Sequence, residues 1–217
     1  MKLSTFLLDL FFPPRCTFCH ALVENGEIKV CDRCKKDLPQ TRPGSVLKKD
    51  FVKAVAAPFY YENEVRESLL RYKFGNMAGY ADVYAAYVAS CIRESLPDDW
   101  DVISWVPVSK KRLRERGYDQ AELLCRAVAK NLGKEPTRVL DKHRHTKAQS
   151  ATGSAEKRKA NIAGAYRLCG GVDVKDKRIL LLDDIVTTGA TVSECARTLG
   201  MAGAACVYCA AVARQRD

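Results

Sequence analysis

The sequence has no apolar run long enough to cross a bilayer. No stretch approaches the roughly 20 consecutive apolar residues that a membrane helix needs. A secretory signal is not predicted either, because Asp9 interrupts the uncharged run 3–8 and no small-residue cleavage site follows. We therefore expect residues 3–12 to form a short helix packed on the protein, and we expect a cytoplasmic protein without membrane insertion.

The sequence also lacks the Gly-x-x-x-x-Gly-Lys-Ser/Thr pattern, which disfavours a P-loop nucleoside triphosphatase. Internal repeats and low-complexity tracts are missing as well. The 217 residues are 47% hydrophobic and 29% charged, an ordinary globular composition. This length predicts one domain of usual size with a small appendage.

Acidic residues are scarce in one region only. Residues 107–167 contain 16 Lys and Arg against 6 Asp and Glu, so this segment carries the whole net charge of +10. Such an excess favours anionic partners, including phosphates, nucleic acid or a membrane surface, without choosing among them. The alternative interpretation is a solvated basic surface.

Ten cysteines are present, and their spacing is not that of a secreted disulfide framework. Two Cys-x-x-Cys pairs, Cys16 with Cys19 and Cys31 with Cys34, have the spacing of a closed tetrahedral site for structural Zn²⁺. A pair of disulfides or a redox motif is the alternative. We expect a helix and zinc ribbon in residues 1–40 and a separate domain in residues 41–217.

The rest of the chain alternates between strand and helix patterns, which predicts an α/β fold with a parallel sheet flanked by helices. The unbroken apolar run 179–182 indicates a strand buried on both faces. Expected strands span 51–61, 100–106, 138–140, 165–169, 178–184 and 206–212. Expected helices span 62–74, with Val65, Leu69, Leu70 and Phe74 at helical spacing, and 78–96, 118–132 and 191–201. Residues 41–50 read as a linker, and residues 141–164 as a long polar loop.

The most informative segment follows the strand 178–184. Asp183 and Asp184 stand at its end, and a turn containing Thr187, Thr188, Gly189, Ala190 and Thr191 leads into a helix. Such a turn can direct backbone N–H groups and hydroxyls at one phosphate, at the carboxyl end of a strand where α/β proteins bind ligands. The neighbouring carboxylates suit the hydroxyls of a sugar. The alternative is a solvent-exposed helix cap.

This segment resembles the phosphoribosyl pyrophosphate (PRPP) motif of type I phosphoribosyltransferases. The resemblance assigns Asp183 and Asp184 to the ribose, and indirectly to Mg²⁺, and the turn 187–191 to the 5-phosphate. It also places two pyrophosphate-contacting loops in the basic region. The candidate residues of these loops are Pro107, Val108, Lys110, Arg112, Arg116, Lys147 and Arg158.

Further motifs extend the resemblance over almost the full chain. Two Cys-x-x-Cys pairs, the run Arg116-Gly-Tyr-Asp-Gln120 and the segment Asp183-Asp-Ile-Val-Thr-Thr-Gly189 together resemble the ComF family. That family comprises phosphoribosyltransferase-like proteins with an N-terminal zinc ribbon, linked to bacterial competence.

The resemblance implies an enzyme that transfers phosphoribosyl from PRPP to an unidentified acceptor. The alternative is a non-catalytic protein of DNA uptake that handles single-stranded DNA and binds PRPP as a regulator. Few aromatic residues lie in the basic region 107–167, which counts against a dedicated single-strand reader.

Overall fold

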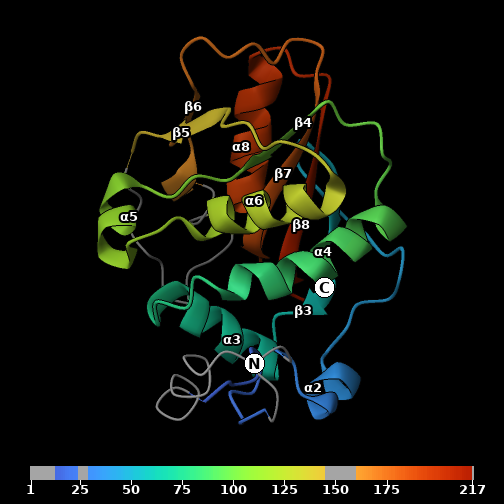
Figure 1. The fold of residues 1–217 in the computed structure, drawn as a ribbon. Coiled ribbons are helices and arrows are strands. Elements are labelled where there is room, and N and C mark those ends of the chain that lie inside the picture. The colour runs from blue at the N-terminus through green and yellow to red at the C-terminus, as the bar shows by residue number, and fades with distance from the viewer. Residues whose placement is uncertain (1–12, 24–28, 145–159, 217) are drawn as a thin grey trace.

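The computed structural model describes residues 13–23, 29–144 and 160–216. A central sheet has the strand order β1-β2-β8-β7-β4, and β3 also pairs with β8 (Figure 1). Only β1 runs antiparallel to its neighbour; the other pairings in this sheet are parallel. The strands of this sheet are β1 (Leu47–Lys49), β2 (Val52–Ala56), β3 (Phe59–Tyr60), β4 (Val102–Trp105), β7 (Arg178–Val186) and β8 (Cys206–Arg214). A separate antiparallel hairpin joins β5 (Leu140–Lys142) to β6 (Tyr166–Leu168).

Helices cover both faces of the sheet. One face carries α3 (Asn63–Phe74), α4 (Tyr80–Ser95) and α6 (Gln120–Leu132), and the other carries α8 (Ala190–Met201). Two shorter helices, α2 (Asp32–Asp37) and α5 (Lys110–Arg116), lie at the edges. The predicted mixed α/β fold with a mostly parallel sheet is confirmed.

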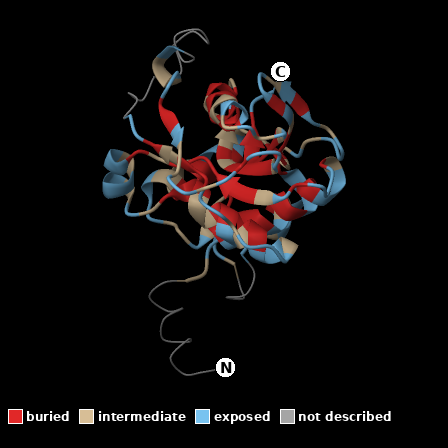
Figure 2. Ribbon diagram, turned by 90° about the horizontal axis from the view of Figure 1, so that it is seen from above, coloured by how far each residue is buried: buried red, intermediate tan, exposed pale blue. Residues whose placement is uncertain are grey.

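Strand β7 shows why its apolar run is unbroken. Leu180 and Leu182 pack into the apolar cluster under α3, α4 and α6, whereas Ile179 and Leu181 pack into the cluster under α8. Alternate side chains of a strand point to opposite faces, so a strand between two helical layers needs apolar residues at every position. The buried residues accordingly form a continuous layer through the molecule (Figure 2).

Two expectations about strands need correction. The single strand expected over 51–61 is divided into β2 and β3, because Pro58 has no N–H to donate to a sheet. The segment 41–50, expected as a linker, contains the edge strand β1. Leu47 of this strand is buried, which a polar linker composition did not indicate.

The zinc ribbon shares a core with the larger domain. Phe18 is fully buried, and its ring meets that of Phe59 edge-on at 5.4 Å between centroids. The hydroxyl of Ser68 on α3 donates to the carbonyl of Thr17 at 2.6 Å. A boundary between residues 40 and 41 stays a prediction, and the helix expected over 3–12 lies outside the described residues.

Across the described ranges, every helix is too short or too polar to cross a membrane.

Candidate functional site

A cavity of about 600 Å³ lies at the carboxyl ends of β4 and β7. The start of α8 forms one wall, α5 and the hairpin β5-β6 form the opposite wall, and the end of α3 closes the side between them. The parallel register of β4 with β7 brings the two strand ends to one edge, so segments far apart in sequence meet there.

The turn 187–191, called the cradle below, leads into the N-terminus of α8. The first backbone N–H groups of a helix have no acceptor within the helix itself. Gly189 is the N-cap of α8 at φ 81°, a left-handed conformation that a residue without a Cβ adopts most readily. The N-cap residue Gly189 offers no side-chain cap, and the start of α8, with its positive dipole end, borders the cavity. The hydroxyl of Thr188 accepts from the N–H of Ala190 at 3.4 Å. This arrangement suits an anion.

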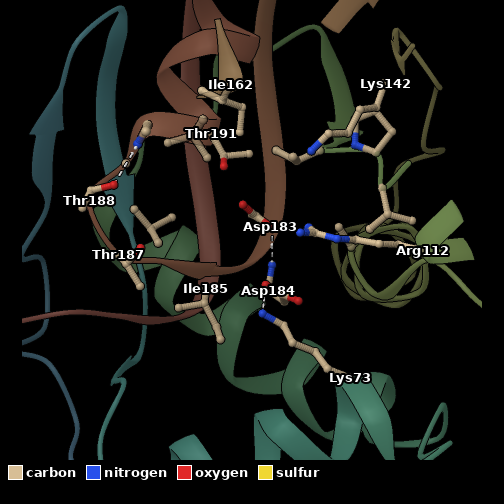
Figure 3. A pocket seen from close by; sticks show the side chains of 18 of the residues that line it. Lys73, Arg112, Lys142, Ile162, Asp183, Asp184, Ile185, Thr187, Thr188 and Thr191 are labelled. Carbon is tan, nitrogen blue, oxygen red and sulfur yellow. Dashed lines mark hydrogen bonds and ion pairs between the residues drawn. The ribbon is translucent and has the colours of Figure 1, made fainter. Parts of the chain in front are cut away.

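Two adjacent carboxylates occupy the floor of the cavity. Asp183 accepts a hydrogen bond from the N–H of Asp184 at 2.8 Å, and Asp184 forms an ion pair with Lys73 of α3 at 3.0 Å (Figure 3). Burial and the neighbouring charge of Asp184 raise the pKa of Asp183 above its usual range, and the charge of Lys73 opposes this shift. The oxygen atoms of this floor can accept hydrogen bonds from hydroxyl donors, and Asp184 already holds the ammonium of Lys73.

Asp119 attaches the loop after β4 to α6. Its carboxylate caps α6 by accepting from the N–H groups of Ala121 and Glu122, and it also accepts from the N–H of Val108 at 2.9 Å. Burial raises the pKa of Asp119, although these hydrogen bonds oppose the shift. Pro107 and Val108 are thereby held in the cavity wall.

The run from Arg116 to Gln120 has a structural explanation at each position. Gly117 ends α5 at φ 78°, and the Tyr118 hydroxyl donates to the carbonyl of Tyr72 on α3. Arg116 donates to the side-chain oxygen of Gln120 at 2.8 Å, and Gln120 is fully buried. The hydrogen bond to Gln120 orients the guanidinium of Arg116 at the cavity wall.

Lys142 is a buried cation at the same cavity. It projects from β5, is 9% exposed, and donates to the hydroxyl of Tyr166 at 3.1 Å. Burial, and after it the nearby charge of Arg112, lower the pKa of Lys142 to about 8, while Asp183 has the opposite effect. Lys142 and Arg112 approach the carboxylates from the side opposite the threonines (Figure 3).

Most of the residues predicted for the site meet at this cavity. Its lining includes Pro107, Val108, Arg112, Arg116, Asp183, Asp184, Thr187, Thr188, Gly189, Ala190 and Thr191. Lys110 begins α5 on the exposed surface, outside the described lining. Lys147 and Arg158 lie outside the described residues. The roles assigned to all these residues stay predictions.

Sequence reasoning missed two residues at the end of α3. Lys73 was not a candidate, and Phe74 was counted with the apolar face of its helix. Phe74 is in fact 71% exposed and lines the cavity, and Leu70 is only half-buried beside it. A basic residue next to an aromatic one at a helix end, before Gly75-Asn76, was the available signal.

The four predicted zinc ligands form one cluster. The sulfur atoms of Cys16, Cys19, Cys31 and Cys34 all lie within 4.8 Å of one another. The Cys19 and Cys31 sulfurs are 3.6 Å apart, close to the roughly 3.8 Å expected between thiolates bound tetrahedrally to Zn²⁺. The backbone N–H of Cys31 also donates to the sulfur of Cys16 at 3.4 Å. The cluster fits a structural Zn²⁺.

Comparisons with known proteins agree with both parts of the chain. The family described as the phosphoribosyl transferase domain matches residues 119–217, and the double zinc ribbon domain matches residues 7–44. Competence protein ComFC of Streptococcus pneumoniae (strain ATCC BAA-255 / R6) is 28% identical over 192 residues, which cover 87% of this chain and 82% of that protein. ComFC of Bacillus subtilis (strain 168) is 26% identical over 175 residues, or 78% of this chain and 65% of that protein.

A second group of relatives matches over a shorter segment. DNA utilization protein YhgH of Escherichia coli (strain K12) is 36% identical over 108 residues, covering 49% of this chain and about half (46%) of that protein. Among solved structures, an allosteric regulatory enzyme of purine biosynthesis aligns with a TM-score of 0.38 and 22% identity, over 59% of this chain and 24% of that one. That superposition is too loose to carry an argument. The two domain matches and the similarity to ComFC and YhgH support a phosphoribosyltransferase-like protein of the ComF family with an N-terminal zinc ribbon.

Proposed function

We propose that this protein binds PRPP at the cavity and transfers its phosphoribosyl group to an acceptor. The observation that supports this most directly is the adjacency of an anion cradle and a carboxylate pair at one strand end. The cradle suits the 5-phosphate, and Asp183 and Asp184 suit the 2- and 3-hydroxyls of the ribose. The cations Arg112, Arg116 and Lys142 suit the pyrophosphate.

In the proposed reaction, a nucleophilic atom of the acceptor forms a bond to ribose C1. The bond between C1 and the pyrophosphate oxygen breaks, and the pyrophosphate leaves with the electron pair. The acceptor's proton passes to water. Positive charge develops on the ribosyl group in the transition state, and the carboxylates of Asp183 and Asp184 stabilise it electrostatically. The cradle fixes the sugar phosphate in position, which reduces the entropic cost of reaction.

Carboxylate oxygens are ligands that Mg²⁺ prefers, and the floor of the cavity presents two such groups side by side. Asp183 and Asp184 are therefore the described residues that would hold Mg²⁺ together with PRPP. Bound there, the ion would neutralise charge on the leaving pyrophosphate.

We further propose that this activity serves DNA uptake in the cytoplasm, because relatives bear the names competence protein and DNA utilization protein. The second candidate is a non-catalytic partner of single-stranded DNA and the DNA-uptake machinery that binds PRPP as a regulator. The local excess of basic residues in 107–167 supports it. Its affinity for DNA would fall steeply with salt.

One assay separates the two candidates. The protein is incubated with PRPP and Mg²⁺, and pyrophosphate release is followed with bases, nucleosides, nucleotides and single-stranded DNA. Release that depends on one acceptor supports the transferase. No release with any acceptor, together with salt-sensitive DNA binding, supports the second candidate.

Substitution of the carboxylates tests the site itself. Replacing both Asp183 and Asp184 by Ala should abolish PRPP binding, measured by calorimetry. Asp173→Ala, an exposed carboxylate at a loop, is the matched control and should leave binding unchanged. Unchanged binding in the double variant would refute the site.

A further inference from the structure

The C-terminal half of α3 touches both the zinc ribbon and the candidate site. Ser68 and Arg71 on this helix contact the ribbon, whereas Lys73 forms the ion pair with Asp184. The helix lies between the N-terminal segment and the rest of the fold (Figure 1). Because each residue of a helix rises only about 1.5 Å, the ribbon contacts and the carboxylate floor are joined by a short rigid element.

The guanidinium of Arg71 binds the backbone of the ribbon. It donates to the carbonyl of Phe18 and, at 3.3 Å, to the carbonyl of Thr17. Both acceptors lie between the predicted zinc ligands Cys16 and Cys19, in the segment called the knuckle below. The buried Nε atom of Arg71 has no hydrogen-bond partner among the described residues, which costs free energy. The two knuckle carbonyls therefore orient this side chain.

Ser68 makes a second attachment to the same knuckle. Its hydroxyl donates to the carbonyl of Thr17 at 2.6 Å, and the hydroxyl of Tyr84 on α4 lies 2.5 Å from its oxygen atom. Ser68 and Tyr84 are both fully buried, so water cannot replace a lost partner at low cost. The ring of Tyr84 also meets that of Tyr72 on α3 edge-on, at 5.4 Å between centroids. The knuckle is thus fixed to α3 inside the core.

The other end of this connection lies at the candidate site. The Tyr72 hydroxyl donates to the backbone carbonyl of Gln120 at 2.8 Å, and the Tyr118 hydroxyl donates to the carbonyl of Tyr72. Lys73 places its ammonium 3.0 Å from a carboxylate oxygen of Asp184. The last carbonyls of a helix have no partner within the helix, so the position of its final turn depends on contacts of this kind. The knuckle and the strand end therefore support one turn of α3.

We propose that Arg71 is a positioning residue, through which the zinc ribbon sets the place of Lys73 at the carboxylate floor. The knuckle carbonyls keep their positions while the four thiolates hold Zn²⁺. The final turn of α3 then presents Lys73 where its charge offsets the repulsion between the two carboxylates. Loss of Zn²⁺ lets this turn shift, so zinc affinity and PRPP affinity are coupled and each raises the other by the same factor. The proposal rests on the proposed function for the identity of the ligand.

The first test measures PRPP affinity by calorimetry, with Mg²⁺, in zinc-loaded full-length variants. Arg71→Met should weaken binding about fivefold or more, which is the lower end of the usual coupling between two sites. Arg71→Lys keeps a charged donor and should recover part of the loss. Arg66→Met removes an exposed arginine of the same helix, paired with Glu67, and as the matched control it should bind PRPP like the wild type.

A double-mutant cycle tests whether Arg71 acts through Lys73. Lys73→Met alone should weaken PRPP binding, and adding Arg71→Met should then weaken it no further. An equal loss from Arg71→Met in both backgrounds, or wild-type affinity in Arg71→Met, would overturn the proposal. Ser68→Ala removes a ribbon contact without exposing a buried charge. It should show the same dependence on Lys73 to a smaller extent, so it decides the question if Arg71→Met does not fold.

A second measurement needs no PRPP. Zinc affinity is determined by competition with a chromogenic chelator in the absence of any sugar phosphate. Lys73→Met changes no residue of the ribbon, yet it should lower zinc affinity several-fold, whereas Lys53→Met, an exposed lysine on β2, should not. If the wild type does not bind PRPP but Lys73→Met weakens zinc binding, the proposed function fails and the coupling of ribbon and floor stands. Unchanged zinc affinity in Lys73→Met overturns the coupling even where PRPP binds.

Discussion

The ammonium of Lys73 lies 3.0 Å from a carboxylate oxygen of Asp184, and the two side chains are only 20% and 12% exposed. Lys73 belongs to α3 and Asp184 to the end of β7, so the ion pair joins the helical layer to the floor of the site. It supplies positive charge beside two adjacent carboxylates that would otherwise repel each other.

Lys73→Met should destabilise the protein by about 2 kcal/mol, between the values typical of exposed and buried ion pairs. The loss should grow as pH rises. The raised pKa of Asp183 means that the folded state binds more protons than the unfolded chain above pH 4, so stability falls with pH until Asp183 ionises. Removing Lys73 raises this pKa further and extends the fall to higher pH. Urea unfolding between pH 5 and pH 9 measures the effect.

Two controls accompany that measurement. Lys35→Met breaks an ion pair of equal length, 3.0 Å to Asp32, whose partners are 51% and 88% exposed, and it should have little effect. Lys73→Met combined with Asp184→Asn should recover part of the lost stability. Equal losses in Lys73→Met and Lys35→Met would contradict the role of the buried pair.

Lys142 should make anion binding depend on pH. Its pKa of about 8 means that the ammonium loses its proton in mildly alkaline solution, so affinity for inorganic pyrophosphate should decrease as pH rises through 8. Lys142→Arg keeps the charge and should remove this pH dependence of pyrophosphate affinity. Lys142→Met should bind pyrophosphate weakly at every pH. The groups whose charges act on Lys142 are Arg112, Asp119, Asp183 and Cys195.

As pH rises, Lys142 should make the protein more stable, whereas it makes pyrophosphate binding weaker. The unfolded chain binds more protons than the folded protein between about pH 8 and pH 10.5, so this residue makes stability increase with pH over that interval. Calorimetry with pyrophosphate and urea unfolding together check both signs. A pyrophosphate affinity with the same pH profile in the wild type and in Lys142→Arg would contradict the assignment.

Gly189→Ala should weaken phosphate binding at the cradle. The residue has φ 81°, and a Cβ would lie 2.8 Å from the Cδ atom of Lys49. Gly171→Ala is the matched control, because φ is 77° there and a Cβ would meet no described atom within 4 Å. Both variants carry backbone strain of about 1 kcal/mol. Only Gly189→Ala should also lose affinity for ribose 5-phosphate, and Lys49→Ala in the same chain should restore part of it.

Cys34→Ser should release zinc and destabilise the whole chain by several kcal/mol. Phe18 of the ribbon packs against Phe59 and Tyr87, so losing the metal should loosen the core shared with the larger domain. Cys169→Ser, a half-buried cysteine outside the cluster, is the control. Metal content by mass spectrometry and thermal unfolding are the readouts. Two separate unfolding transitions in the wild type would contradict a shared core.

The sequence alone was sufficient for the parallel α/β fold and for the zinc ribbon. It was also sufficient to bring Asp183, Asp184 and the turn 187–191 to one strand end. Each of these features depends on residues that are close together in the chain, so local patterns predict it. An apolar run predicts a buried strand, paired cysteines predict a metal site, and a glycine before a helix predicts the phosphate-binding turn. Long-range packing is not needed to recognise them.

Only the tertiary structure decided that Lys73, Phe74 and Lys142 line the cavity. Lys73 and Phe74 come from α3 and Lys142 from β5, and nothing local distinguishes them from solvated or core residues of the same type. Asp119 holds Val108 because α6 packs beside the end of β4, a contact between elements that local pattern does not encode. Side-chain direction and burial are properties of the assembled layers, so the environment that lowers the pKa of Lys142 and leaves Phe74 exposed exists only once the chain has folded.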